Sequence, residues 1–445
     1  MKILVLNGSP KGEYSITLQT VRYLEKKYPA HTFEVLHVGQ KIKSLEKNFT
    51  PALEAMDRAD AMLFSYPVYT FIAPCQLHKF IALMKAHSAR VSGKPVTQIT
   101  TSKHFYDTTA HRYVQDNVQE MGMHFIRGLS ADMDDLTTEK GQIEAEKWFD
   151  HFLWSQEQGY FEPYHPITPS KSVPVTVPEE DFAGKKGDVV IITDLSPENV
   201  QLSGMISRFR TRLPYATRVV NLREYPFNGG CLGCFRCAVS GKCVHKDGFD
   251  TFLREKIQTA DAMVYAFTIS DHSMGPLFKM YDDRQFCNGH RTVTIGMPVA
   301  YLISGGYGKE NNLQTIIEGR AQVGSNILSG IATDEVDTDA AIDRLAASLT
   351  YALEHKNTGP QNFLGVGGMK IFRDLIYQMR GMMRADHKFF RAHGQYDFPQ
   401  KKWPMSLAMY LVGAMIANPK LHSKMGNKMN EGMLMPYKKV LDKIK

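Results

Sequence analysis

Four cysteines lie within thirteen positions in the second half of the chain, in the pattern Cys231-x2-Cys234-x2-Cys237-x5-Cys243. Thiolates at such short spacing can ligate one centre without help from elsewhere in the chain. Zinc usually takes two x2 pairs joined by a longer span, whereas three cysteines at successive x2 intervals are typical of cubane iron–sulfur clusters. The spacing therefore favours an iron–sulfur cluster, with zinc and free thiols that pack a loop as alternatives.

A second stretch that could do chemistry opens the chain. The apolar run at 2–6 is typical of a buried strand and ends in Asn7-Gly8-Ser9-Pro10-Lys11-Gly12, before apolar residues recur at helical spacing. Such a loop leaves free backbone N–H groups at a helix amino terminus, where the helix dipole favours an anion. We expect it to bind a phosphate monoester, and a plain strand-to-helix turn is the alternative. The candidate residues are Gly8, Ser9, Pro10, Lys11, Ser15, Ile16 and Thr17.

Apolar runs alternate with helical patterns along residues 1–160. Two further buried strands are expected at 61–65 and 96–101, with helices between them. This alternation is typical of a parallel sheet covered by helices on both faces. We therefore expect the first domain to be a doubly wound α/β domain.

The pattern starts again after a stretch rich in proline. Residues 161–186 hold five prolines and are expected to form a semi-rigid linker. The run at 188–193 then repeats the first strand, and the tetrapeptide Ala-Asp-Ala-Met at 59–62 recurs letter for letter at 260–263. Such self-similarity indicates a duplication, with a second domain over 187–356 that holds the cysteine cluster.

Two stretches of the first domain resemble a known family. Gly8-Ser9-Pro10-Lys11 followed by Ser15-x-Thr17 resembles the phosphate loop of the flavodoxin-like NAD(P)H-dependent FMN reductases, and 59–69 is similar to their next strand and second FMN loop. The resemblance implies a five-stranded parallel sheet with FMN at its carboxyl edge. It implies hydride transfer from NAD(P)H to FMN near Tyr69, the candidate catalytic residue. Pro67, Val68 and Tyr69 would border the flavin ring, and Thr101, Ser102, Lys103 and His104 would approach its pyrimidine edge.

The second copy departs from this pattern in its first loop and adds the cysteines. Asp194 and Glu198 stand where a phosphate would bind, so one FMN per chain is expected. The stretch at 230–250 resembles the cysteine motif of iron–sulfur flavoproteins, which are relatives of the same family, although Gly248 stands where a second acid is common. This resemblance implies a [4Fe–4S] cluster that exchanges electrons with FMN.

The last part of the chain, 357–445, is basic and rich in methionine. It holds fifteen Lys and Arg against five Asp and Glu, and eleven of the 23 methionines. We expect helices that pack over the sheets and cover the cofactor, with contact to a membrane surface or a protein partner as the alternative. The apolar stretch at 404–419 is too short to span a bilayer, and no motif for nucleic-acid binding accompanies the charge.

The composition indicates the class of protein and the compartment in which it works. The chain has 445 residues, 43% of them hydrophobic and 22% charged, which is typical of a globular protein of two or three domains. Its six cysteines are mostly clustered rather than spread as in a disulfide framework, so we expect a reducing cytoplasm. No signal-peptide core or membrane span is expected.

The sequence thus predicts an α/β fold of two tandem flavodoxin-like doubly wound parallel sheets and a helical carboxyl-terminal region. The expected function is an NAD(P)H-dependent FMN oxidoreductase that passes reducing equivalents, with a [4Fe–4S] cluster as a further carrier, to a small-molecule or protein acceptor. The alternative is an iron–sulfur flavoprotein that carries electrons to and from ferredoxin-like partners. We also expect the cysteine loop to face the phosphate loop across the domain interface, so that the two motifs form one site.

Overall fold

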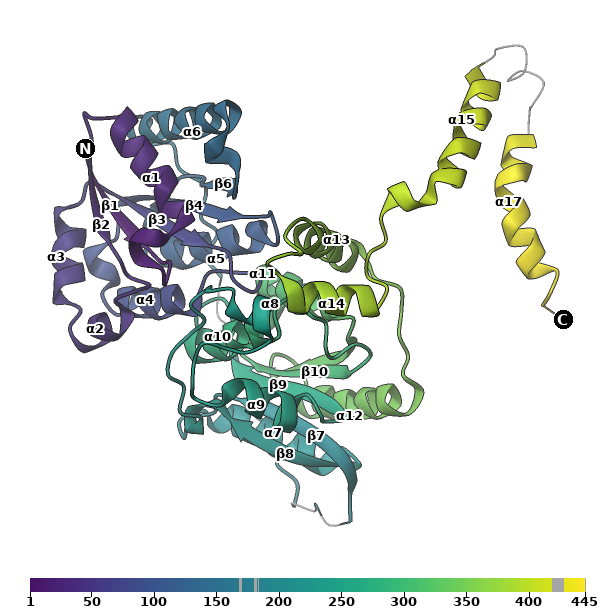
Figure 1. The fold of residues 1–445 in the computed structure, drawn as a ribbon. Helices are drawn as coiled ribbons and strands as arrows, with labels where there is room; N and C mark the ends of the chain where they lie inside the picture. The colour runs from purple at the N-terminus through teal and green to yellow at the C-terminus, as the bar shows by residue number, and fades with distance from the viewer. Residues whose placement is uncertain (168–169, 180–181, 183, 418–427, 445) are drawn as a thin grey trace. The chain divides into compact units, whose positions relative to one another are not determined.

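The computed structural model describes residues 1–167, 170–179, 182, 184–417 and 428–444. These residues divide into two units, Met1–Phe389 and Phe390–Lys445. Both predicted sheets lie in the first unit (Figure 1).

The first sheet is parallel and has the strand order β2-β1-β3-β4-β5, with β6 also paired to β4. Successive residues of a strand face opposite sides. In β1, Ile3 and Val5 therefore pack with α1 and α6, while Leu4 and Leu6 pack with the helices of the other face. The strands are β1 (Lys2–Asn7), β2 (Thr32–Leu36), β3 (Ala61–Pro67), β4 (Pro95–Ser102), β5 (His124–Phe125) and β6 (Leu129–Asp132).

Helices cover both faces of this sheet. One face carries α1 (Ile16–Lys27) and α6 (Glu139–Gln158). The other carries α2 (Ile42–Lys47), α3 (Thr50–Arg58), α4 (Cys75–Lys85) and α5 (Asp107–Glu120). Short 3₁₀ turns complete the domain: η1 (Gly12–Tyr14), η2 (Ser88–Arg90) and η3 (Asp135–Thr137).

The second sheet repeats the topology of the first. Its order is β8-β7-β9-β10-β11, again all parallel, so each strand takes the place of its counterpart in the first copy. This confirms the predicted fold of two tandem doubly wound sheets. The strands are β7 (Lys186–Thr193), β8 (Tyr215–Asn221), β9 (Ala262–Thr268), β10 (Pro298–Ser304) and β11 (Ile327–Thr333).

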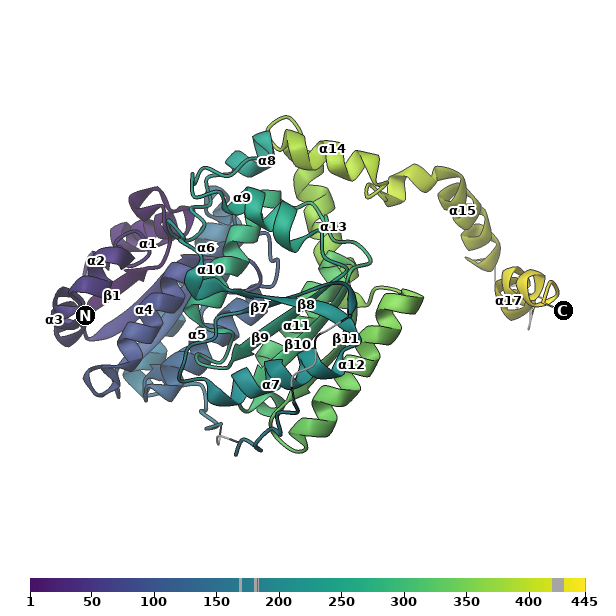
Figure 2. The same cartoon turned by 90° about the horizontal axis from the view of Figure 1, so that it is seen from below.

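Two helices, α7 (Val200–Arg212) and α12 (Thr338–His355), lie together on one face of the second sheet (Figure 2). The other face carries α10 (Gly275–Arg284) and α11 (Asn311–Gly324). The cysteine loop lies between β8 and β9. Shorter elements are η4 (Leu222–Glu224), α8 (Arg236–Ser240), α9 (Phe249–Phe252), the π-turn η5 (Leu253–Ile257), η6 (Gln285–Asn288) and η7 (Tyr307–Lys309).

The two sheets meet through helices rather than through strand edges. α10 packs against α4, and α11 packs against α5. Ile316 and Val323 of α11 belong to the same buried cluster as the core of the first domain. This interface brings the carboxyl edge of the first sheet next to the cysteine loop of the second copy.

Between α6 and β7 the described residues form neither helix nor strand. Within the predicted linker, residues 168–169, 180–181 and 183 lie outside the described residues. The predicted boundaries between the domains stay predictions.

The carboxyl-terminal region is helical, as expected. α13 (Phe363–Gln378) packs on α11 and belongs to the first unit, and α14 (Arg384–Ala392) crosses the division at Phe389. The second unit contains η8 (Pro399–Lys402), α15 (Trp403–Ala417) and α17 (Lys428–Leu441). Residues 418–427 lie outside the described residues, and no helix in the rest is long and apolar enough to cross a membrane.

Candidate functional site

The loop after β1 is held in shape by its own side chains. Asn7 is fully buried; its Nδ2 donates to the Gly12 carbonyl at 2.9 Å and its Oδ1 accepts from the Ser9 N–H at 3.2 Å. Ser15 caps α1, because its Oγ accepts from the Leu18 N–H at 3.4 Å. The first N–H groups of an α-helix have no acceptor inside the helix, so this amino terminus can receive an anion.

A cavity of about 220 Å³ opens beside this loop. It unites the three predicted stretches of the first domain with the cysteine loop of the second. From the predicted flavin-binding set it is lined by Ser9, Lys11, Ser15, Ile16, Thr17, Pro67, Val68, Tyr69, Thr101, Ser102 and Lys103. From the cysteine loop it is lined by all four cysteines, Cys231, Cys234, Cys237 and Cys243.

Three predicted residues do not line this cavity: Gly8, Pro10 and His104. A Cβ at Gly8 would lie 2.9 Å from Leu77 Cδ2, so glycine here allows close packing against α4. The ring of His104 contacts the Asp107 carboxylate at 2.8 Å, and its backbone has a φ of +57°. His104 therefore borders α5 rather than the cavity.

The cysteine loop directly contacts the loops that are predicted to bind the flavin. Lys11 Nζ lies 5.6 Å from the centre of the Phe235 ring, a cation–π distance. Gly233 has a φ of +60°, and a Cβ there would lie 1.8 Å from the Tyr69 hydroxyl oxygen. Only glycine fits this position, because the backbone is left-handed and a Cβ would clash with the Tyr69 hydroxyl. The structure thus brings the two motifs into one site across the domain interface.

The four cysteines share the cavity but do not form a metal site. Burial raises the pKa of Cys231, and burial with the nearby Asp386 carboxylate raises that of Cys237 to about 11. Cys234 is exposed. Among the described residues, no group of three or more Cys, His, Asp or Glu side chains is placed to hold one metal ion. The structure therefore does not support the predicted [4Fe–4S] cluster.

Helix α10 of the second copy anchors the loop that carries Tyr69. Lys279 Nζ donates to the Tyr69 carbonyl at 2.9 Å and pairs with the Asp283 carboxylate, and both charged side chains are fully buried. Asp283 in turn accepts from Thr70 Oγ1 at 3.1 Å and from the Cys75 N–H, at the start of α4, at 2.7 Å. Thr70 has a left-handed backbone with a φ of +44°, which these contacts hold in place.

Arg284 lines the cavity and is not among the predicted site residues. It is 1% exposed and forms a bidentate pair with Asp247, at 2.7 and 2.8 Å, and it also donates to the Gly229 carbonyl at 2.8 Å. Burial alone would lower the pKa of its guanidinium, but the Asp247 carboxylate outweighs this and raises it. Arg284 is therefore a fixed positive charge beneath the cysteine loop.

The edge formed by β4 contains one polar atom without a partner. Thr101 is 7% exposed, and its buried Oγ1 has no hydrogen-bond partner among the described residues. Lys103, by contrast, is held by Asp132 at 2.7 Å and Asp134 at 2.8 Å. Thr101 also lines the cavity, and a buried polar group without a protein partner needs a water or ligand group to complete its hydrogen bonding.

Helix α13 forms a wall of the cavity through Ile371, Phe372 and Leu375. The Phe372 ring stacks on Phe105 at 4.4 Å between ring centres. Next to this helix, the buried Asp386 carboxylate accepts from His290 and Arg291, which ties α14 to the second domain. The periodicity of α13 indicates a buried face, but nothing in its sequence says which surface it covers.

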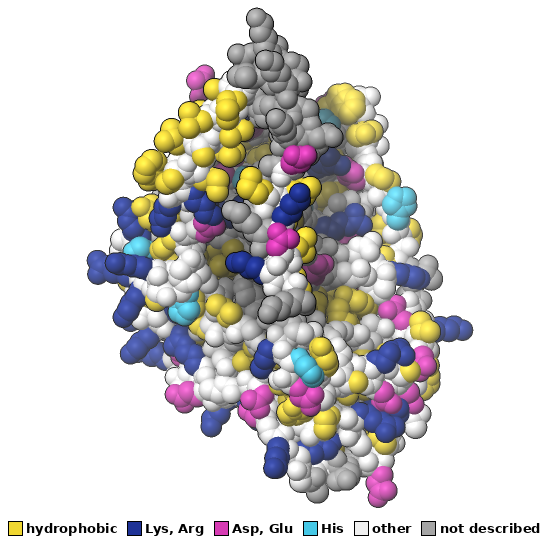
Figure 3. Space-filling view, turned by 90° about the vertical axis from the view of Figure 1, so that its right-hand side faces the viewer, with side chains coloured by type: hydrophobic (Ala, Val, Ile, Leu, Met, Phe, Trp, Pro, Cys, Tyr) yellow, Lys and Arg dark blue, Asp and Glu magenta, His cyan; other side chains and the backbone are white. Residues whose placement is uncertain are grey.

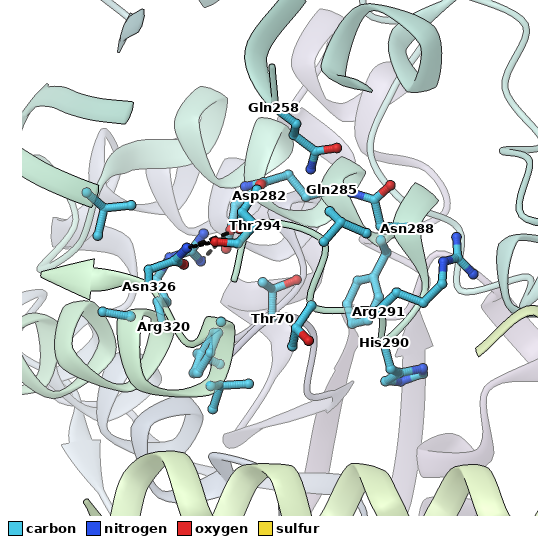
Figure 4. A pocket seen from close by; sticks show the side chains of 18 of the residues that line it. Thr70, Gln258, Asp282, Gln285, Asn288, His290, Arg291, Thr294, Arg320 and Asn326 are labelled. Atoms are coloured by element: carbon cyan, nitrogen blue, oxygen red, sulfur yellow. Dashed lines mark hydrogen bonds and ion pairs between the residues drawn. The ribbon is translucent and has the colours of Figure 1, made fainter. Parts of the chain in front are cut away.

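A second chamber of about 180 Å³ adjoins the first (Figure 4). The two share six lining residues: Thr70, Phe105, Phe286, Gly289, His290 and Phe372. On the far side of this chamber Arg320 pairs with Asp282, and Asn326 Nδ2 donates to the Thr294 carbonyl at 2.6 Å. The chamber therefore combines polar side chains with an aromatic rim.

Comparison with known proteins defines the class of the first domain. Residues 1–134 match the sequence profile of the NADPH-dependent FMN reductase family. The first domain has a doubly wound parallel sheet and is similar in sequence to this family, as the resemblance implied. The match covers less than a third of the chain, and no curated protein is similar enough to the chain to count as a relative.

Solved structures that are similar to the chain cover about a third of it. The flavoenzyme NAD(P)H:(acceptor) oxidoreductase FerB of Paracoccus denitrificans is 16% identical and covers 34% of this chain and 97% of its own, with a TM-score of 0.28. An NAD(P)H:quinone oxidoreductase of Methanothermobacter marburgensis is 12% identical, with coverages of 37% and 99% and a TM-score of 0.28. General stress protein 14 of Treponema denticola, solved with FMN, is 10% identical, with coverages of 35% and 98% and a TM-score of 0.27.

Proposed function

We propose that the protein is an NAD(P)H-dependent flavin oxidoreductase that binds one FMN in the cavity of the first domain. The observation that carries the proposal is the convergence of the phosphate loop, the Tyr69 loop and the Thr101 edge on one cavity at the carboxyl ends of parallel strands. Ligands of doubly wound sheets bind at this edge. The match of residues 1–134 to an FMN reductase family supports the same ligand.

The residues present fit FMN. The amino terminus of α1, with Lys11 at its rim, suits a phosphate dianion, because N–H groups, the helix dipole and a cation all favour negative charge there. The unpartnered Thr101 Oγ1 suits a polar edge of the flavin ring. Pro67, Val68 and Tyr69 supply the apolar border that an aromatic ring needs.

When bound, FMN supplies hydride acceptance and release, which the side chains of the chain cannot perform themselves. The chain's own part is to bind, orient and exclude water. Burial raises the pKa of Tyr69, so its phenol stays protonated at neutral pH and can donate a hydrogen bond. Phe286 and α13 line the cavity with apolar side chains, and the adjoining chamber gives room for a second substrate.

The cysteine loop enters this proposal as a wall of the cavity. Because its side chains do not fit a bound cluster in the described residues, no electron-transfer step is derived through one.

The proposal is tested by titrating the flavin-free protein with FMN and with riboflavin, which lacks the phosphate. We expect FMN to bind at least ~10-fold more tightly, because charge-assisted hydrogen bonds to the phosphate add to the ring contacts. Lys11→Ala should lower the ratio of FMN affinity to riboflavin affinity. Lys47→Ala, which changes an exposed lysine on α2, should leave this ratio unchanged. Equal affinity for the two flavins would contradict the proposed phosphate site.

A further inference from the structure

The positive charge of the protein is concentrated in its second unit. Residues 390–445 hold ten Lys and Arg against three Asp and Glu, whereas residues 1–389 hold 43 of each kind. The net charge of +7 therefore belongs to the last 56 residues. A basic segment of this size is attracted to negatively charged surfaces, and the attraction weakens with salt.

The same unit exposes an apolar helix. α15 contains no charged residue along its fifteen positions. Large apolar side chains are exposed along it, including Trp403 (67%), Tyr410 (79%) and Leu411 (63%). A helix that packs on a protein surface usually keeps a polar face for water, and α15 has none. Figure 3 shows hydrophobic side chains gathered in the upper part of the view.

The length of α15 decides how it can meet a bilayer. Fifteen residues at ~1.5 Å each span about 22 Å, which is less than the ~30 Å hydrocarbon core. The helix is therefore suited to lie in the interface rather than to cross the bilayer. Lys401 and Lys402 stand directly before it, and Trp403 opens it, as is typical of residues at the level of the lipid headgroups.

A second helix of the unit has matching properties. α17 exposes Met433, Leu434, Tyr437 and Leu441, and Lys438 is exposed among them. Methionine-rich apolar surface next to lysine adapts readily to a soft surface such as the headgroup region. One apolar helix and one helix with exposed apolar side chains, both near lysines, thus occur within one 56-residue unit.

We propose that residues 390–445 bind the surface of an anionic lipid bilayer. α15 and the apolar side of α17 enter the boundary between headgroups and acyl chains, while the lysines contact anionic headgroups. A second copy of the chain fits less well, because a helix pair buries one stripe of each helix and would leave the rest of α15 in water. An acidic protein would satisfy the lysines but not the apolar surface of α15.

The test is co-sedimentation of the full chain with vesicles, either pure phosphatidylcholine or phosphatidylcholine mixed with phosphatidylglycerol. We expect at least ~10-fold tighter binding to the anionic vesicles, falling steeply as salt is raised. Insertion of α15 should shift the emission of Trp403 to the blue. Trp403→Phe should remove this shift and keep the binding.

The double variant Leu407→Asp/Leu411→Asp places two charges on α15 and should abolish binding. Its matched control is Val200→Asp/Val336→Asp, which adds the same charge at exposed positions of the first unit and should reduce binding only slightly. Absence of binding to anionic vesicles would overturn the proposal. So would equal loss in the two double variants, or formation of a stable dimer through α15 without lipid binding. None of these readouts depends on FMN.

Discussion

At the scale of single residues, polar side chains of the cavity have a defined protonation or hydrogen-bonding state. Tyr69 is a neutral phenol, Arg284 is a charge fixed by Asp247, and Thr101 offers a free hydroxyl. The cysteine thiols differ in solvent exposure, because only some of them are buried. Since a thiolate is the reactive form, burial should decide which cysteines react.

We therefore predict that Cys234, the exposed cysteine, is alkylated first when the native protein is treated with iodoacetamide. Cys75 and Cys231 should react far more slowly, because burial raises the pKa of both. Peptide mapping by mass spectrometry gives the rate at each site.

Two controls accompany the alkylation experiment. Cys234→Ser should remove the fast phase, and all six cysteines should react in denaturant. Protection of all four clustered cysteines that is lifted by an iron chelator would contradict the free thiols described above.

Much of the cavity could be predicted residue by residue, and the failures have physical causes. The position of the predicted phosphate loop beside the cavity was predictable, because strand, small residues and helix follow one another within a few positions. The position of His104 outside the cavity was not predictable, because its side-chain direction depends on a left-handed backbone and on Asp107. Arg284 was not predicted as a site residue, since its partner Asp247 lies 37 positions away in the sequence.

At the scale of elements, the second copy lacks the predicted phosphate-loop residues and supports loops of the first domain. Helix α10 contributes Lys279 and Asp283, which hold the Tyr69 loop and the amino terminus of α4 in the first domain. The sequence of α10 does not show that the groups bound by Lys279 and Asp283 lie in the other domain.

Lys279→Met should destabilise the protein by about 3–5 kcal/mol, because it leaves the Asp283 carboxylate buried without its cation. The same change at an exposed pair, Lys140→Met beside Glu144, should cost less than ~1 kcal/mol. Urea unfolding at neutral pH measures the free energy of unfolding of both variants. A loss below ~1 kcal/mol for Lys279→Met would show that this buried pair does not hold the two domains as described.

At the scale of the whole molecule, two domains of one topology make a single site. The alternation of strands and helices and the repeated tetrapeptide were enough to predict two parallel sheets. They could not show that α13 forms a cavity wall, because an apolar helix face does not name the surface it covers. The composition also could not predict the boundary between the two units at Phe389, since this boundary follows from packing.

The central claim is that this cavity binds an FMN that NAD(P)H reduces. Its most direct test is to mix the FMN-loaded protein anaerobically with NADPH, and separately with NADH, and to follow the visible absorbance of the flavin. We predict bleaching by at least one of the two, at a rate on the order of 10 s⁻¹. A bound flavin that stays oxidised with both nucleotides, but is reduced by a ferredoxin, would contradict the account and identify an electron carrier instead.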